Sequence, residues 1–448
     1  MPAKNKLSRR RFLTTSAAAL SAPYFVPGRV LGKDGAVAPS ERITLGMVGT
    51  GGMGQFSARA FARYKDAQIV AVCDVDENNR NACAQSVNEA YENQDCAKYR
   101  DFREVISRED IDAVNIATPD HWHALVCVAA AEAGKDIYCQ KPLTHTFAEG
   151  QAIVAAVKKH NVIFQVGSQQ RSRSDFRHAV ELIMNGHIGR VKHIEVGLPT
   201  GHTDPEKTTS PELCKEIDPP DSLDYDFWCG PSKKLPYIPA RLHFHWRWNM
   251  AYGAGQLMDW IGHHNDIAHW AIGEDLGGPV EVQAFNFTYP EDKSIYDAAV
   301  NYEVWSKYAS GITISCANKY PNGTKFIGDE GWLFCSRSKL AGSHPSILSR
   351  DFNPGPKSAY HSPEHHRNFL DGVKSRKPCI CPAEVGHRSI TPGYLGLASD
   401  ALGGREIHWD PRTETVINDP EAELLLKSVD YRSPWSLTPR KTTRVARV

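Results

Sequence analysis

The sequence has no excess charge of either sign and no paired-cysteine motif. Its 448 residues carry 52 basic and 52 acidic side chains, so the formal net charge is zero. Such a chain has no general electrostatic attraction to nucleic acid or to anionic membranes. The cysteines number eleven, and the closest two, Cys379 and Cys381, match no common metal spacing. We therefore expect buried reduced thiols, no bound metal and no nucleic acid partner.

The sequence also has no apolar run long enough to serve as a mature membrane span. The stretch at 13–26 is short and contains Pro23. It follows the residues S-R-R-R-F-L at 8–13, which resemble a twin-arginine (Tat) export signal, and A-V-A at 36–38 matches a cleavage site. We predict that residues 1–38 are a signal peptide and linker that engages the Tat machinery, leaving a soluble periplasmic protein. The alternative is a basic tail.

The sequence around residues 43–55 organises the N-terminal half. An apolar run at 43–48 predicts a buried strand, the G-x-G-x-x-G at 49–54 a tight turn, and residues 53–64 a helix. In this context the motif is a dinucleotide-binding fingerprint. The first glycine permits the turn, the second lets a pyrophosphate approach the backbone, and the third lets the helix approach the strand. The predicted cofactor-binding residues here are Gly49, Gly51, Gly52, Met53 and Gly54.

A carboxylate follows the next apolar run. The strand predicted at 69–73 ends in Asp74, about 20 residues after the last glycine, where an acid binds the ribose hydroxyls. Because Asp74 would repel a 2′-phosphate, we expect NAD, with NADP less favoured. Arg80, a few residues later, weakens this preference.

Residues 39–165 alternate strands with helices, which predicts a doubly wound parallel sheet and a Rossmann domain. Strands are expected at 43–48, 69–73, 112–117, 136–139 and 162–166, with helices at 53–64, 77–90, 122–134 and 147–160. Ligands bind beyond the carboxyl ends of such strands. Two polar turns lie at such strand ends, one at 118–121 and the other at 140–142. They contain the further predicted cofactor contacts Thr118, Pro119, His121 and Lys141.

In residues 166–448 strands and helices no longer alternate. A helix at 174–185 and a strand at 191–197 precede the segment 199–250, which has little periodicity. A helix at 256–272, strands at 280–288, 297–305, 311–317 and near 332–335, and helices at 364–374 and 389–402 follow. Strands without intervening helices indicate a mostly antiparallel sheet. We predict an α+β domain for substrate binding and oligomerisation.

Taken in order, these motifs resemble the glucose-fructose oxidoreductase / inositol dehydrogenase / MocA (Gfo/Idh/MocA) family. The resemblance covers the fingerprint, A-T-P at 117–119, a Lys-Pro at 141–142, and an Asp and a His four residues apart, Asp259 and His263. One departure is Gln140, where the family has Glu, so a negative charge beside Lys141 is missing. The resemblance implies an open-faced second sheet and a homo-oligomer, either a dimer or a tetramer.

Three residues are the predicted catalytic group. Lys141 would hold the substrate oxygen and stabilise a developing alkoxide. Asp259 would orient His263, one turn along the same helix face, and the imidazole, with a pKa near working pH, would take the hydroxyl proton. Spacing alone equally allows a surface lysine and a surface pair, and the resemblance favours catalysis.

Further residues are candidates for substrate contacts or a metal. Aromatic rings stack on sugar faces, although most such rings belong to a core. The predicted substrate-binding residues are Arg171, Trp246, Trp248 and His264. Asp259, His263, His264 and Asp266 also suggest metal ligands. Adjacent helical histidines point about 100° apart, however, so we predict no metal.

Together these features predict an exported oxidoreductase that transfers a hydride between a nicotinamide cofactor and a sugar or polyol. Tat carries folded proteins, and free dinucleotide is not expected in the periplasm, so the cofactor would be loaded before export and held tightly. One alternative is a redox-neutral glycoside-cleaving enzyme that oxidises, eliminates and re-reduces its substrate. Another is a non-catalytic sugar-binding protein that retains NAD.

Overall fold

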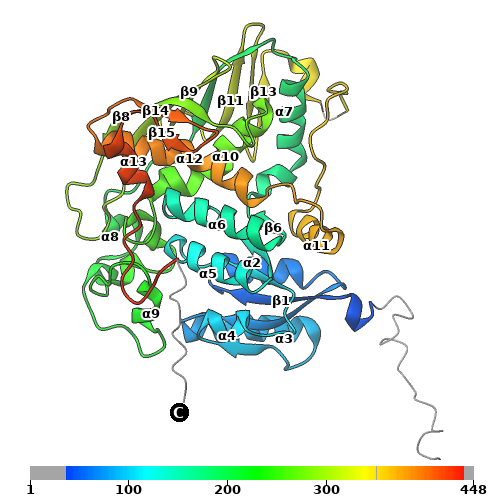
Figure 1. The fold of residues 1–448 in the computed structure, drawn as a ribbon, viewed down its shortest axis with the longest axis vertical. Coiled ribbons are helices and arrows are strands. Elements are labelled where there is room, and N and C mark those ends of the chain that lie inside the picture. The colour runs from blue at the N-terminus through cyan, green and yellow to red at the C-terminus, as the bar shows by residue number, and fades with distance from the viewer. Residues whose placement is uncertain (1–36, 350, 438–448) are drawn as a thin grey trace, which may run out of the picture. The chain divides into compact units, whose positions relative to one another are not determined.

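The computed structural model describes residues 37–349 and 351–437 (Figure 1). The predicted twin-arginine segment, its apolar stretch and the end of the chain after residue 437 lie outside these residues. Within these residues the chain divides into two units between Arg42 and Ile43, and the first contains the short 3-10 helix η2 (Pro39–Glu41). Among the helices of the described ranges, none is both long enough and apolar enough to cross a membrane.

A six-stranded parallel sheet carries the glycine motif. Its order is β3-β2-β1-β4-β5-β6, so the strand order reverses between β1 and β4, and every adjacent pair is parallel. This confirms the doubly wound sheet. The strands are β1 (Ile43–Val48), β2 (Ala67–Cys73), β3 (Ala97–Tyr99), β4 (Ala113–Ile116), β5 (Asp136–Cys139) and β6 (Phe164–Val166).

Helices pack on both faces of this sheet. Helix α2 packs with α3 and α11, whereas α5 packs with α4 and α6 (Figure 1). Strand β3 and helix α4 were not predicted, because each is too short to show periodicity. Helix α5 begins at Asp120, two residues earlier than expected. The helices are α2 (Gly52–Phe61), α3 (Glu77–Tyr91), α4 (Phe102–Ile106), α5 (Asp120–Glu132), α6 (Phe147–His160) and α11 (His365–Ser375).

A second sheet has nine strands in the order β13-β12-β11-β7-β10-β9-β8-β14-β15. Its described neighbours pair antiparallel, except that β7 and β10 are parallel, so the mostly antiparallel sheet is confirmed. The strands are β7 (Val191–Gly197), β8 (Pro279–Thr288), β9 (Asn301–Tyr308), β10 (Thr313–Ala317), β11 (Gly323–Gly328), β12 (Trp332–Cys335), β13 (Leu340–Gly342), β14 (Ile407–Asp410) and β15 (Thr415–Val416). The strand expected at 297–305 lies later, and β11, β13, β14 and β15 were not predicted.

The remaining helical elements include two long helices and several short ones. The segment 199–250, which has little periodicity, contains only short turns of helix. The elements are η3 (Gln169–Ser172), α7 (Ser174–Met184), α8 (Pro205–Thr208), η4 (Pro211–Cys214), α9 (Tyr225–Cys229), η5 (Pro239–Arg241), η6 (His245–Trp248), α10 (Gly255–Ile272), η7 (Pro345–Leu348), α12 (Ala383–Ala401) and α13 (Pro420–Lys427).

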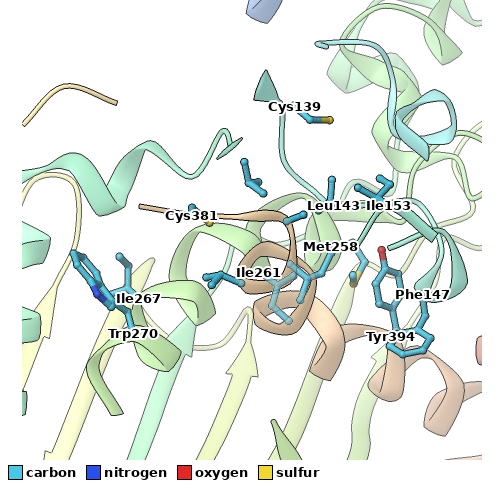
Figure 2. Packing of buried hydrophobic residues seen from close by; sticks show 14 of the residues in the cluster. Cys139, Leu143, Phe147, Ile153, Met258, Ile261, Ile267, Trp270, Cys381 and Tyr394 are labelled. Carbon is cyan, nitrogen blue, oxygen red and sulfur yellow. The ribbon is translucent and has the colours of Figure 1, made fainter. Parts of the chain in front are cut away.

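Helices α10 and α12 lie between the second sheet and helix α6 (Figure 1). The two helices approach closely, because a side chain at Gly393 would place a Cβ 2.5 Å from Met258 Sδ. Figure 2 shows the core around them, with Met258 and Ile261 of α10, Tyr394 of α12 and Leu143 before α6. All eleven cysteines are unpaired in the described ranges, and ten of them are buried, which confirms the prediction of buried thiols. This core fixes α10, and hence Asp259 and His263, against the parallel sheet.

Candidate active site

One cavity of about 660 Å³ joins the glycine turn to helix α10. Its walls come from the carboxyl ends of the parallel strands, the segment 199–250, helix α10 and the turn after β12. This is the position expected for a ligand of a doubly wound sheet. The predicted site residues that line the cavity are Gly49, Gly51, Gly52, Met53, Asp74, Thr118, Pro119, Lys141, Trp246, Asp259 and His263.

The glycine turn has the geometry that a bound pyrophosphate requires. Gly49 has a φ of +80°, and a Cβ there would lie 2.6 Å from the Ala117 carbonyl carbon. A Cβ on Gly54 would lie 2.0 Å from the Gly49 carbonyl oxygen, so helix α2 packs directly on the turn. By contrast, a Cβ on Gly51 or Gly52 would meet no atom within 4 Å. The backbone at the N-terminus of α2 therefore faces open space, where an anion can approach its amides.

Asp74, the residue after strand β2, forms hydrogen bonds with this turn. Its Oδ2 accepts hydrogen bonds from the Thr50 amide at 2.6 Å and the Thr50 hydroxyl at 3.1 Å. Its Oδ1 accepts from the Asp76 amide at 2.9 Å. Burial raises the pKa of Asp74, while the hydrogen bonds from Asp76 and Thr50 oppose that rise. Asp74 thus positions the turn, and its contact with a ribose stays a prediction.

Two buried polar atoms of the cavity wall have no partner and are consistent with a bound dinucleotide. Thr118 Oγ1 and Gln140 Nε2 are buried, belong to cavity-lining residues and have no hydrogen-bond partner in the described part of the chain. A buried polar group without a partner is costly, so a ligand with its own polar atoms is expected there. With the open glycine cradle, these atoms suit the amide and hydroxyl groups of a nicotinamide nucleotide.

Lys141 and Asp259 form an ion pair across the cavity. Lys141 Nζ lies 2.7 Å from Asp259 Oδ1 and donates also to the Asp259 carbonyl oxygen at 2.8 Å. Arg247 Nε donates to the same Oδ1 at 3.1 Å. Burial alone would raise the pKa of Asp259, but the charges of Lys141 and Arg247 lower it. Asp259 is therefore ionised, and it fixes the lysine ammonium in the cavity.

This pairing corrects one expectation. Asp259 engages Lys141 and Arg247, and the described residues contain no hydrogen bond between Asp259 and His263. Arg247 was missed because it lies in the segment without periodicity, although its place between Trp246 and Trp248 was a signal of a built site. The i, i+4 spacing puts Asp259 and His263 on the same cavity wall without joining them.

His263 is neutral in this site. Burial, the charges of Lys141 and Arg337, and the neighbouring His264 hold its pKa well below the usual value. Its Nδ1 is buried and has no partner among the described residues. The expectation of a pKa near working pH is therefore wrong, because a cationic imidazole is disfavoured in a buried site that already holds two cations.

Asp120 is another carboxyl group of the cavity wall, and sequence reasoning missed it. It lies in the first turn of α5, which was expected to begin two residues later. Burial and the nearby charge of Asp259 raise the pKa of Asp120 well above its ordinary range. At this end of the cavity, Asp259 thus carries the charge that pairs with Lys141 and Arg247, whereas burial disfavours the charged forms of Asp120 and His263.

Besides Gly54, which packs on the glycine turn, four predicted contacts lie outside the cavity wall, because other side chains or carbonyls hold them. His121 bonds to the carbonyls of Trp228 and Tyr252 at 2.9 and 3.3 Å. Trp248 packs against His202, with ring centroids 4.0 Å apart, and His264 bonds to Asn322 at 2.5 Å. The four residues are His121, Arg171, Trp248 and His264.

Arg171 is fully engaged in ion pairs. It is 1% exposed and bonds to Asp266 at 2.7 and 2.9 Å and to Asp275 at 2.6 and 3.2 Å. Asp266, the last candidate metal ligand, is thus occupied by Arg171. No group of three or more metal-ligating residues is present within residues 37–349 and 351–437.

The fold and cavity define a dinucleotide-binding protein in which a Rossmann sheet adjoins a mostly antiparallel sheet. More particularly, the chain belongs to the Gfo/Idh/MocA oxidoreductase family. Residues 43–168 match the family's NAD-binding Rossmann fold, and residues 173–437 match its C-terminal alpha/beta domain. The N-terminal part is therefore a Rossmann domain of the family's NAD-binding type.

Several relatives have named activities. A myo-inositol 2-dehydrogenase of Thermotoga maritima is 29% identical over 79% of this chain and 95% of its own length. A levoglucosan dehydrogenase of Pseudarthrobacter phenanthrenivorans is 35% identical over 34% of this chain and 39% of its own length. The chain aligns with only 36–42% of the length of four relatives, which include that enzyme.

One solved structure shows the likeness in fold. The aldose-aldose oxidoreductase of Caulobacter crescentus, complexed with glycerol, has a TM-score of 0.60 and 19% sequence identity. The match covers 82% of this chain and 99% of that one.

Proposed function

We propose that this protein is an NAD-dependent oxidoreductase that interconverts a hydroxyl and a carbonyl group on a sugar or polyol. The observation that carries the proposal is the Lys141–Asp259 ion pair beside a neutral His263, in the same cavity as the glycine turn. The relatives named as inositol and levoglucosan dehydrogenases support the substrate class.

The chain's own residues supply the polar part of the reaction. Bound NAD supplies the acceptor for the hydride that leaves the carbinol carbon. Lys141 Nζ, fixed by Asp259, donates a hydrogen bond to the substrate oxygen and stabilises the negative charge that develops on it. His263, held in its neutral form, accepts the hydroxyl proton. The alcohol thus loses one hydride and one proton and becomes a carbonyl compound.

The proposal extends to export and to a tightly held cofactor. The S-R-R-R-F-L at 8–13 supports export through the Tat system to the periplasm. A cofactor loaded before export must be recycled in place, so one sugar would reduce it and a second carbonyl compound would reoxidise it. Asp74 supports NAD over NADP. Exposed Phe285 and Trp332 on strands β8 and β12 support assembly as a dimer or tetramer.

In the first experiment, the mature protein is purified without added cofactor and denatured. The released small molecules are then identified and quantified by mass spectrometry. We expect NAD in near-stoichiometric amount. The intact protein is then given sugars and polyols while absorbance at 340 nm is followed. Reduction of the bound cofactor supports the oxidoreductase. Turnover of a chromogenic glycoside without any oxidant would instead support redox-neutral cleavage, and sugar binding without an absorbance change would support a non-catalytic protein.

Export has its own test. The double change Arg9→Lys and Arg10→Lys is expected to keep the protein in the cytoplasm at full length, whereas the unchanged chain is found shortened in the periplasm. Equal amounts of both chains in the periplasmic fraction would overturn the export proposal. If no dinucleotide is released in the first experiment, the proposal of a tightly held cofactor is overturned.

A further inference from the structure

Arg337 is a cation of the cavity that has no acidic partner. It lies in the turn between β12 and β13, lines the cavity and remains exposed at its edge. Its Nε donates to Gln170 Oε1 at 2.9 Å. Within the described ranges, its other guanidinium nitrogens donate to no residue, and it forms no salt bridge. Two adjacent donors therefore remain available to a ligand.

The position of this guanidinium is built by its neighbours. It stacks over the Trp260 ring, 5.0 Å from the centroid. Gln170, only 2% exposed, is itself held by a bond from its Nε2 to the His263 carbonyl at 2.8 Å. Arg173 donates to the Arg337 carbonyl at 2.7 Å and so holds the backbone of the turn. A planar fork fixed in this way is suited to bind two oxygens of one anion.

The charges of this end of the cavity are not balanced. Lys141 and Arg247 share the one ionised carboxylate, Asp259. Burial raises the pKa of Asp120 and lowers the pKa of His263, so it disfavours the charged form of each. The other lining acids accept hydrogen bonds from backbone amides: Asp74 from Thr50 and Asp76, and Asp76 from Asn78. Because Asp259 is already shared by Lys141 and Arg247, a neutral sugar would leave Arg337 without a counter-charge of its own among the described residues.

We infer that the sugar substrate carries an anionic substituent, a carboxylate or a sulfate ester, that binds the free donors of Arg337. This rests on the proposed function and adds the chemical class of the substrate. The hydroxyl that reacts lies at Lys141, and the anionic group lies toward the edge of the cavity, where Arg337 is fixed by Gln170 and Trp260. A carboxylate and a sulfate present the same two oxygens to the fork, so the experiment separates them.

The test measures dissociation constants by calorimetry on the cofactor-loaded protein with pairs of probes that differ in charge. One pair is D-glucuronate and D-glucuronamide, and the other is D-glucose 6-sulfate and D-glucose. We expect the anion of at least one pair to bind about tenfold or more tightly than its neutral partner, since hydrogen bonds to charged groups are the strong ones. The pair that shows the preference identifies carboxylate or sulfate.

Arg337→Gln is expected to remove that preference, and Arg337→Lys to restore only part of it, because lysine keeps the charge but not the fork. Arg412→Gln is the matched control: Arg412 is 88% exposed in its side chain, lies outside the cavity wall and changes the net charge equally. It should leave the preference intact.

The outcomes separate this inference from the proposed function. Equal binding of both members of both pairs, or no binding of either anion, overturns the anionic substrate, as does a preference that survives Arg337→Gln. If neutral sugars then reduce the bound cofactor at 340 nm, the oxidoreductase stands without the inference. If an anion binds through Arg337 but no probe or other sugar reduces the cofactor, the anion site stands and the oxidoreductase fails.

Discussion

Helix α10 carries two cation–carboxylate clusters, about two turns apart, that look alike in sequence and differ in structure. In the first, Asp259 pairs with Lys141 and Arg247, and all three residues line the cavity. In the second, Asp266 pairs with Arg171, whose guanidinium also reaches Asp275. No member of the second cluster lines the cavity.

The difference is in the number of donors that remain available. The guanidinium of Arg171 donates to two carboxylates and to the Ile380 carbonyl. Because Arg171 is only 1% exposed, a ligand cannot reach it. Lys141 faces open space beside a neutral imidazole. A cluster whose buried arginine already donates to several acceptors stabilises the fold, whereas a cluster that borders a cavity and keeps unused donors can bind a substrate. Arg337 also borders the cavity and keeps unused donors, and it has no acidic partner among the described residues.

The largest effect is expected from breaking the cluster around Arg171. Arg171→Met leaves Asp266 buried without its main counter-charge, and such losses cost about 3–5 kcal/mol. We expect the free energy of unfolding to fall by that amount in urea denaturation, with Arg412→Met, at an exposed position, changing it by about 0.5 kcal/mol or less. A loss below about 1 kcal/mol for Arg171→Met would show that the two clusters are not different in kind.

The cavity cluster should respond in activity more than in stability. Lys141→Met removes the donor to the substrate oxygen, and kcat/KM is expected to fall about 10²–10³-fold, as for other preorganised donors. Because Asp259 keeps Arg247, the melting temperature should fall less than in Arg171→Met. Lys233→Met, at an exposed lysine outside the cavity wall, is the matched control and should retain full activity. Sugar turnover by Lys141→Met at an undiminished rate would contradict the assigned role.

The smallest effect concerns pH and sharpens the contrast between His263 and a surface histidine. The pKa of His263 lies well below the usual 6.5, so the neutral form that accepts the proton persists as pH falls. We therefore expect kcat/KM to stay level from pH 8 to about pH 6 and to decline only below that range. The pH–rate profile of the first half-reaction measures this. A decline centred near pH 6.5 would mean that the imidazole titrates as if it were exposed.

Much of the parallel sheet could be predicted because its signals are local. The apolar run, the three glycines and Asp74 lie within about 30 residues, the length of a single supersecondary unit. The predicted helix containing Asp259 and His263 is also observed, as α10. Strand β3 and helix α4 escaped prediction because three to five residues show no period. Arg247 and Arg337 were not predicted because Arg247 lies in the one-turn 3-10 helix η6 and Arg337 in the turn after β12, and segments this short show no period.

The sequence by itself determined the dinucleotide fingerprint, the Rossmann sheet, the antiparallel character of the second sheet and the presence of Lys141, Asp259 and His263 in the site. Only the tertiary structure decided which charges meet. Lys141 and Asp259 are 118 positions apart, and Gln170 and Arg337 are 167 apart. The pKa of His263 and the saturation of Arg171 also depend on such distant neighbours. Burial and pairing are properties of the packed chain, because a residue's charge state is set by what surrounds it in space.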